Sequence, residues 1–289
     1  MAFTTLDSLI SAWSLERGQK LVYMKTMVGA CAQYVPHSFW TTAGTPSNPT
    51  TGASPTNGKA NGRVVVGGES PTNGAPRYTL PTGGRTMHLV GCAFAANGSG
   101  SLNGSTILLD RIADVNLNID EATGAITGMD ATSRLASTAG QGDGGQLWGE
   151  VTTAFGAGSN TFNVTYTNQL GVGSRVTPNF STVASAVVNR SINAGLYIPL
   201  QDGDTGVRSV ESITLVSGAG TATGKWNLCI VRPFCTVPIP SAGVMIDRDM
   251  VTNNPSLPRV WDNTAFTTIM LPSVATTLNT YGEIRICEG

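Results

Sequence analysis

Apolar and polar residues alternate with a period of two in two neighbouring runs of the chain, one on each side of a glycine-rich loop. In the first run Ile213 and Leu215 fall on one face and Val210 and Val216 on the other. In the second run three apolar side chains share a face: Trp226, Leu228 and Ile230. This spacing is typical of β-strands, so the segment 202–233 predicts an antiparallel hairpin. Pro233 lacks the N–H of a ladder bond, and the second strand is predicted to end there.

The clearest single alternation lies in Thr161–Thr167, where Phe162, Val164 and Tyr166 point to one face. Residues Ser105–Val115 are apolar enough for a strand or a short helix, and their length leaves both open. The other predicted strands are short runs: Lys20–Met27, Arg85–Phe94, Ala184–Val188, Leu196–Leu200, Phe266–Leu271 and Glu283–Cys287. Many short strands separated by turns, without interleaved helices, predict an all-β fold of the β-sandwich or jelly-roll type, with antiparallel sheets and long loops rich in Gly, Ser, Thr and Asn.

One segment, Thr5–Gly18, has the pattern of a short amphipathic helix. Its apolar side chains are spaced three and four residues apart and form a single stripe: Leu6, Leu9, Ile10 and Trp13. Thr5 can cap the first turn and Gly18 can close the last one. The stripe must be covered either by the chain's own sheet or by a neighbouring subunit. Its four residues are therefore the candidate partner-binding residues.

The tract from residue 42 to residue 84 is rich in Gly, Pro, Ser, Thr and Asn. The pentapeptide SPTNG occurs in it twice, at Ser54–Gly58 and Ser70–Gly74, and its Asn-Gly step favours turns. We expect this tract to be a surface excursion with little core of its own. The predicted organisation is an N-terminal helix and arm over residues 1–27, followed by a β-rich domain over residues 28–289.

Composition argues against several classes of function. Only 12% of the 289 residues are charged, about half the usual share, and the net charge is −1 with no run of Lys or Arg. We therefore expect neither nucleic acid nor a membrane as a partner. The N-terminus carries Asp7 and no basic region, which is not typical of a secretory signal. The five cysteines are scattered without a C-x-x-C pair, which favours buried free thiols in a reducing compartment over a zinc site.

Few sequence patterns indicate a catalytic or metal-binding site. His37 and His88 are the two histidines of the chain, and without an evident partner both are predicted to be structural. Three close carboxylate pairs could in principle serve a glycosidase, although their separation in space is not given by the sequence: Asp202/Asp204, Asp120/Glu121 and Asp247/Asp249. The segment 202–206 also resembles half of a calcium loop, so Asp202 and Asp204 are a weak calcium candidate that lacks the completing glutamate. We predict no catalytic residue and no cofactor.

Six sequence segments, spread over most of the chain, are informative when they are considered together. They are FTTLDSLI and RGQKLVYMKT near the N-terminus, YTNQ in the middle, then DGDTGVRSVESITL, the single RPF–PIP segment, and DRDMVTNNPSLPRVWD. Together they resemble a family of tailed-bacteriophage virion proteins encoded with head genes. The resemblance implies a structural component of the phage particle, of the capsid decoration or cement kind, and brings no catalytic residues with it. Residues 42–84 are less similar to the family.

Composition and resemblance indicate the same class, because neutral surfaces let many copies pack closely without repulsion. We expect a non-enzymatic virion structural protein that is assembled in the host cytoplasm. Its expected partners are the major capsid protein and copies of itself, as a dimer or trimer. The alternative is a tail, neck or spike component that contacts the host surface and binds glycans, and a glycan-cleaving virion enzyme comes third. Copy number per particle separates the first two, and carbohydrate turnover separates the third.

Overall fold

The structure is a computed structural model, and it describes residues 5–14, 17–27, 29–47, 57–68, 74–98, 103–132, 134, 142–193, 195–218, 223–253 and 257–289. Its strands form three sheets, and all strand pairs within them are antiparallel. This confirms the predicted all-β class of the sandwich or jelly-roll type. The helices are α1 (Leu6–Ser14), α2 (Met250–Asn253) and the 3-10 turn η1 (Lys59–Asn61). Neither described α-helix has the length and apolar character that crossing a membrane requires.

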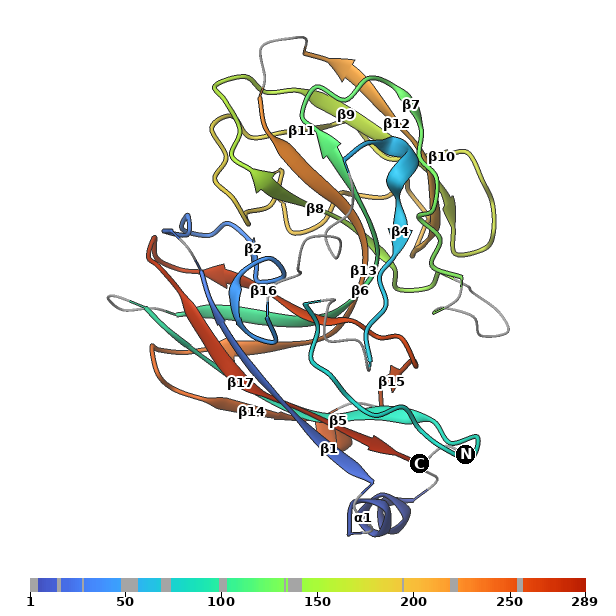
Figure 1. Cartoon of the computed structure of the whole chain (residues 1–289), viewed down its shortest axis with the longest axis vertical. Coiled ribbons are helices and arrows are strands. Elements are labelled where there is room, and N and C mark those ends of the chain that lie inside the picture. Colours follow the sequence, from blue (N-terminus) through green and yellow to red (C-terminus); the bar gives the residue numbers. More distant parts are fainter. Residues whose placement is uncertain are drawn as a thin grey trace.

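The first sheet, here the terminal sheet, has the strand order β14-β5-β17-β1-β3, and β15 also pairs with β5. Its strands are β1 (Gly18–Thr26), β3 (Ala43–Thr45), β5 (Met87–Asn97), β14 (Ile246–Asp249), β15 (Arg259–Val260) and β17 (Asn279–Glu288). Helix α1 and the C-terminal end of β17 lie at the same end of this sheet (Figure 1). Strand β1 pairs with β17 over its whole length, so residues 18–26 belong to the body of the sheet.

The second sheet, the central sheet, has the order β2-β16-β6-β13-β8, and β4 also pairs with β6. Its strands are β2 (His37–Ser38), β4 (Arg63–Val64), β6 (Gly104–Asn118), β8 (Gln146–Thr153), β13 (Lys225–Ile239) and β16 (Phe266–Pro272). The third, the distal sheet, has the order β10-β9-β12-β7, with β11 paired to β9. Its strands are β7 (Gly124–Ala125), β9 (Thr161–Asn168), β10 (Arg175–Val176), β11 (Phe180–Ser181) and β12 (Val207–Ser217).

Two long strands, β6 and β13, run through both lobes of the molecule and connect two hydrophobic cores (Figure 1). One half of the pair packs against the distal sheet, where Trp226 and Leu228 meet Phe162 and Val164. The other half packs against the terminal sheet through a second set of residues: Leu108, Val237, Ile239, Leu89, Phe94 and Ile284. Each lobe is therefore a sheet packed on one end of the same ladder.

The predicted hairpin between β12 and β13 is wrong. Strand β12 pairs with β9 and β7 in the distal sheet, whereas β13 pairs with β6 and β8 in the central sheet, so their connection passes between sheets. Register shifts within β12 also break the period of two: Val207, Val210 and Ile213 are buried at every third position. The bulges therefore place Val210 on the same buried side as Ile213, not on the opposite face.

The prediction that the strand ends at Pro233 is also wrong, because β13 continues to Ile239. Strand β8 pairs with β13 only as far as Val231, so beyond that residue one edge of β13 has no partner strand among the described residues. A register shift against β6 follows directly, between Pro233 and Cys235. A proline at a free edge or beside a bulge does not remove a ladder bond, which explains why the strand tolerates it.

Some of the other predicted strands are present in the structure and others are not. The half-exposed alternation of Thr161–Thr167 is confirmed as β9, and Ser105–Val115 lies in strand β6 rather than in a helix. Residues 184–188 and 196–200 do not form strands. Both instead lie over β8 and bond to it or to its following loop at single points, such as the Ile198 N–H to the Leu147 carbonyl at 2.9 Å. A short apolar segment can therefore cover the edge of a sheet through single hydrogen bonds, without forming a strand of its own.

The described part of the tract from residue 42 to residue 84 contributes buried side chains. Val65 packs in a small cluster with Trp40 and Ala265. Tyr78 is 3% exposed, and its hydroxyl lies 2.9 Å from the Trp261 carbonyl oxygen. The prediction was a surface tract with little core of its own, whereas Val65 and Tyr78 are buried and contact the rest of the protein. Most residues of the two SPTNG copies lie outside the described residues.

Candidate interaction surface

Helix α1 begins with a capping arrangement that its sequence predicts. The Ser8 backbone N–H donates to the Thr5 Oγ1 atom at 3.1 Å, and the Thr5 N–H donates back to the Ser8 Oγ at 3.3 Å. The two bonds satisfy donors that an uncapped helix start would leave without partners. Asp7 lies in the first turn, where a negative charge is favoured by the helix dipole. The helix is therefore a defined element of the fold.

The expected end of this helix at Gly18 is wrong, because α1 ends at Ser14 and Gly18 is the first residue of β1. Gly18 has a different role, which is to make room for an aromatic ring. A Cβ atom on Gly18 would lie 2.3 Å from the Cε3 atom of Trp13. The absence of a side chain lets the indole lie directly against the backbone where the chain turns from the helix into the sheet.

The apolar stripe of α1 is divided between the chain's own core and the surface. Leu9 and Ala12 are buried against Cys287, with Val90 and Val251 packed around them. Leu6 and Ile10, in contrast, are 60% and 57% exposed, and Trp13 is 38% exposed. One flank of the helix therefore closes the outer side of the terminal sheet, while the other flank presents three large apolar side chains to solvent.

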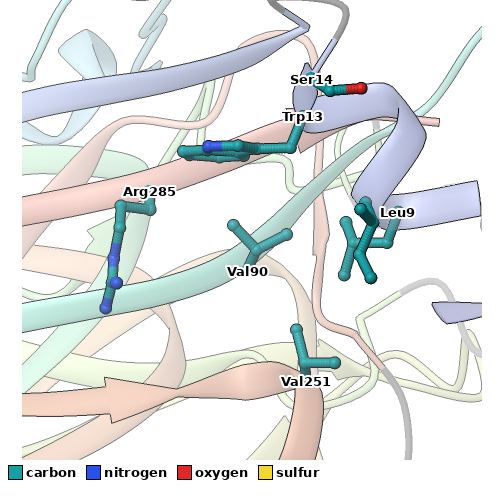
Figure 2. Close-up of a pocket in the computed structure, with 7 residues that line it drawn as sticks. Leu9, Trp13, Ser14, Val90, Val251 and Arg285 are labelled. Atoms are coloured by element: carbon teal, nitrogen blue, oxygen red, sulfur yellow. The ribbon is translucent and has the colours of Figure 1, made fainter. Parts of the chain in front are cut away.

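A cavity of about 370 Å³ lies between α1 and the terminal sheet. In Figure 2 the indole of Trp13 lies across one side, Leu9 stands at another, and Val90 and Val251 lie beneath them. Arg285 stands opposite Leu9 and is held at the rim by ion pairs with Asp247 and with Glu283, the second at 3.6 Å. The cavity is lined mainly by apolar atoms with one charged group at its edge, and this lining suits an apolar side chain better than a polar ligand.

Strand β1 exposes further apolar residues, and charged side chains lie among them at Lys20 and Glu283. The burial of β1 alternates, and its outward side chains include Val22 at 65% and Met24 at 51% exposure. Val22 stands directly opposite Glu283, and its neighbour Lys20 opposite Arg285, which lines the cavity. Residues opposed in this way lie on one face of a sheet. We call Leu6, Ile10, Trp13, Val22 and Met24 the outer patch.

The sequence predicted Leu6, Leu9, Ile10 and Trp13 as partner-binding residues, and the structure assigns Leu9 to the chain's own core. The remaining three belong to the outer patch. Val22 and Met24 were missed, although their signal was present: in Lys20–Met27 apolar residues occupy both faces of a strand, and a surface strand needs only one apolar face.

Asp202 and Asp204, the weak calcium candidate, lie in a turn at the distal sheet. The Asp204 carboxylate accepts hydrogen bonds from the Tyr166 hydroxyl at 2.6 Å, the Asn168 side-chain amide at 2.7 Å and the Arg175 Nε atom at 2.9 Å. Desolvation would raise the pKa of Asp204, but these donors, led by Arg175, outweigh it and lower the pKa. The carboxylate oxygens are thus engaged by protein donors, which fits a structural turn and not a cation site.

The other carboxylate pairs also have structural partners. Glu121 lies 3.1 Å from the Lys59 Nζ atom, and Asp247 pairs with Arg285. Asp249 caps α2 by accepting the Val251 N–H at 2.9 Å, and its hydrogen bond with the Thr252 hydroxyl lowers its pKa. In the part of the chain that the structure describes, no group of three or more His, Cys, Asp and Glu side chains is arranged to hold a metal ion.

A buried ionic network at the junction of the two cores was not predicted. Arg111 donates to Asp114 at 2.8 Å and to Glu150 at 2.7 Å, and Asp110 pairs with Arg134. All five side chains are at most 2% exposed. The available signal was the run STILLDRIADV, in which three charged residues interrupt an apolar strand. Arg63, whose side chain is 27% exposed, also pairs with Asp114 at 2.8 Å, so each of the three carboxylates has a basic partner and the network fits a structural role.

Both histidines are buried, and His37 is fully so. The His37 Nε2 atom accepts the Ala32 backbone N–H at 2.9 Å. Desolvation, together with the nearby Arg190, lowers the pKa of His37 to about 4, so the ring is neutral at physiological pH. The Nε2 atom of His88 lies 2.9 Å from the Thr86 Oγ1 atom. Both rings therefore have hydrogen-bond partners within the fold, His37 on the central sheet and His88 on the terminal sheet.

No protein-family model matches the chain. No curated protein matches its sequence. Among solved structures, similarity is found to that of the infectious bursal disease virus Gx strain, with 9% identity, a TM-score of 0.21, and coverage of 94% of this chain and 80% of that chain. A second match is the VP2 subviral particle of the same virus, with 8% identity, a TM-score of 0.20 and coverage of 93% and 80%. These scores are too low to carry an argument about function.

Proposed function

We propose that this chain is a non-enzymatic structural protein of a bacteriophage virion, a decoration or cement protein that binds the major capsid shell through the outer patch. The observation that carries the proposal is the division of helix α1: Leu9 anchors it to the body, while Leu6, Ile10 and Trp13 stay exposed beside an apolar cavity. A helix fixed in this way offers a preformed apolar surface whose docking requires little ordering. The family resemblance of the sequence and the low charge support the same class.

The absence of enzymatic activity is part of the proposal. Its support is that the carboxylates Asp204, Asp247 and Asp249 are engaged in ion pairs or a helix cap, and that both histidines are buried. The glycan-binding alternative calls for exposed aromatic rings. Trp40, Trp148 and Trp226 are at most 1% exposed and lie in the core. Among the described residues, Trp13 and Tyr34 are the large exposed aromatic side chains, at 38% and 71%, and Trp13 already belongs to the outer patch.

The experiment that tests the proposal is addition of the purified protein to phage particles that lack it. The double variant Leu6→Asp/Ile10→Asp should remain folded, because both side chains are exposed, and should bind the particles at least tenfold more weakly, since charges at the centre of an apolar interface cost several kcal/mol. Leu170→Asp is the matched control: Leu170 is 76% exposed in the turn after β9, on the other lobe, and should bind as the wild type does.

Equal binding of the double variant and the wild type would reject the outer patch as the capsid contact. A wild-type copy number of a handful per particle would instead place the protein in the tail or neck. Release of sugar from host polysaccharide by the pure protein would contradict the non-enzymatic class.

A further inference from the structure

Two cysteines from different sheets place their sulfur atoms side by side. Cys92 lies on β5 in the terminal sheet, and Cys235 lies on β13 in the central sheet. Their Sγ atoms are 3.3 Å apart although 143 positions separate them in the chain. Both are free thiols, and both belong to the core between the two sheets. The contact therefore lies where two separately formed sheets meet.

The other three thiols are placed differently. Cys31 contacts the Met27 Sδ atom at 2.9 Å, and Cys287 lies beneath α1. Cys229 is fully buried in a separate cluster on the central sheet. It is six positions from Cys235 on the same strand, which corresponds to roughly 20 Å along a β-strand, and so the two cannot join. Cys92 and Cys235 are thus the pair that the fold brings together.

The two thiols differ in solvent exposure and in pKa. Cys92 is fully buried, whereas Cys235 is partly exposed. The hydrogen bond with Cys92 lowers the pKa of the Cys235 thiol, and Arg248 on β14 adds to this against the effect of burial. The same hydrogen bond and burial raise the pKa of Cys92. Cys235 is therefore the more exposed of the two thiols and the one that ionises first, as in sites where an attacking cysteine stands beside a resolving one.

We propose that Cys92 and Cys235 form a modification site, at which exchange with a small-molecule disulfide such as oxidised glutathione joins the terminal and central sheets covalently. The sulfurs must approach from 3.3 Å to about 2.05 Å. The register shift between Pro233 and Cys235 lies immediately before the reacting residue, where the ladder with β6 is already interrupted.

The exchange has two steps. The Cys235 thiolate attacks one sulfur of the small disulfide, the S–S bond breaks, and one thiolate leaves, so that Cys235 carries a mixed disulfide. Cys92 then attacks the Cys235 sulfur and expels the second small thiolate, which accepts the Cys92 proton as it leaves. In total the two cysteines are oxidised, one small disulfide is reduced, and two small thiols are released after protonation. No other oxidant is required.

The test uses the full-length reduced protein, incubated with oxidised glutathione, alkylated and mapped by non-reducing mass spectrometry. The wild type should yield a peptide in which Cys92 is linked to Cys235. Cys92→Ser should retain one glutathione on Cys235, because the resolving thiol is missing, and Cys235→Ser should yield neither product. Cys31→Ala, which changes a thiol outside the pair, should form the link as the wild type does. The link closes a long loop, so it should raise Tm by about 5–10 °C.

Three results would overturn the proposal. They are a wild-type protein that keeps all five thiols, a link between any other pair of cysteines, and a Cys92→Ser protein that takes up no glutathione. Full denaturation before incubation provides a reference, because the unfolded chain should form mixed products at several cysteines. Selective linkage at Cys92 and Cys235 should therefore depend on the fold.

Discussion

The Nη1 atom of Arg111 lies 2.7 Å from the Oε1 atom of Glu150, and the two side chains are 1% and 2% exposed. Arg111 is on β6 and Glu150 is on β8, with β13 between them in the sheet, and Asn227 of β13 also donates to the Glu150 Oε1 atom at 2.9 Å. The ion pair therefore joins three strands at the junction of the two cores. A buried charge of this kind is tolerated because it is paired, and it becomes costly when its partner is removed.

Arg111→Met should accordingly lower the free energy of unfolding by about 3–5 kcal/mol, because Glu150 loses its buried cation and Asp114 keeps only the partly exposed Arg63. The measurement is urea unfolding at neutral pH. Arg85→Met is the matched control, since Arg85 pairs with Glu288 at 3.0 Å while a third of its side chain is exposed. It should cost less than about 1 kcal/mol. An equal decrease in the free energy of unfolding for the two variants would mean that the buried ion pairs contribute no more to stability than the exposed one.

Trp226→Ala should cost about 3–5 kcal/mol. The indole is fully buried, and its ring centre lies 5.9 Å from that of Phe162 and 6.5 Å from that of Phe180. Truncation would leave a cavity between the central and distal sheets that these rings cannot fill without moving. Thermal unfolding by circular dichroism measures the loss, and a wild-type Tm would contradict the packing described here.

The contrast between β9 and β13 shows what the sequence could predict. Strand β9 has one buried and one partly buried face, so its alternation is visible in the sequence and its prediction is confirmed. Strand β13 is buried on both faces from Trp226 to Val231, so its pattern contains no information about which strands flank it. For this reason the hairpin with β12 was mispaired. Pairing between strands far apart in sequence is set by the packing of whole sheets, which local periodicity does not encode.

The candidate site was predictable to a similar extent. The spacing of Leu6, Leu9, Ile10 and Trp13 identified the helix and its apolar stripe, and Thr5 identified its start. Which flank of the stripe would face the sheet depends on how α1 approaches the chain's own β5 and β17. The close contact between the Trp13 indole and Gly18, the first residue of β1, belongs to that approach, and the spacing of the stripe does not encode it.

Stability should fall as the pH drops from about 6.5 to about 4, because of His37. The folded state holds the pKa of His37 at about 4 through burial, while in the unfolded chain it returns to about 6.5. In this window the unfolded state binds a proton that the folded state does not, so the contribution is fully present above 6.5 and is lost toward pH 4. The loss amounts to about 3 kcal/mol.

The measurement is the urea midpoint of the wild type and of His37→Gln at pH 7 and pH 4.5. The glutamine can still accept the Ala32 N–H, and its midpoint should vary less with pH than that of the wild type. His88→Gln provides the comparison, because burial lowers the pKa of His88 as well, but the ring is not fully enclosed. The His88 variant should keep most of the fall. An unchanged fall in His37→Gln would show that other groups cause it.

Deletion of residues 1–14 should leave a folded protein whose Cys287 becomes reactive. Strand β1 and its pairing with β17 are retained, so the terminal sheet stays complete. The deletion removes Leu9 and Ala12, which cover Cys287 in the intact chain. Burial raises the pKa of Cys287 to about 11, and exposure should return it toward its ordinary value and increase the thiolate fraction at neutral pH. The reaction rate with a thiol reagent under native conditions should rise by at least tenfold at this residue, and peptide mapping identifies it.

Cys229 lies far from α1 in a separate cluster and should remain unreactive in both proteins. A deleted protein that unfolds without cooperativity, or one in which Cys287 stays unreactive, would show that α1 does not cover the sheet in the way described.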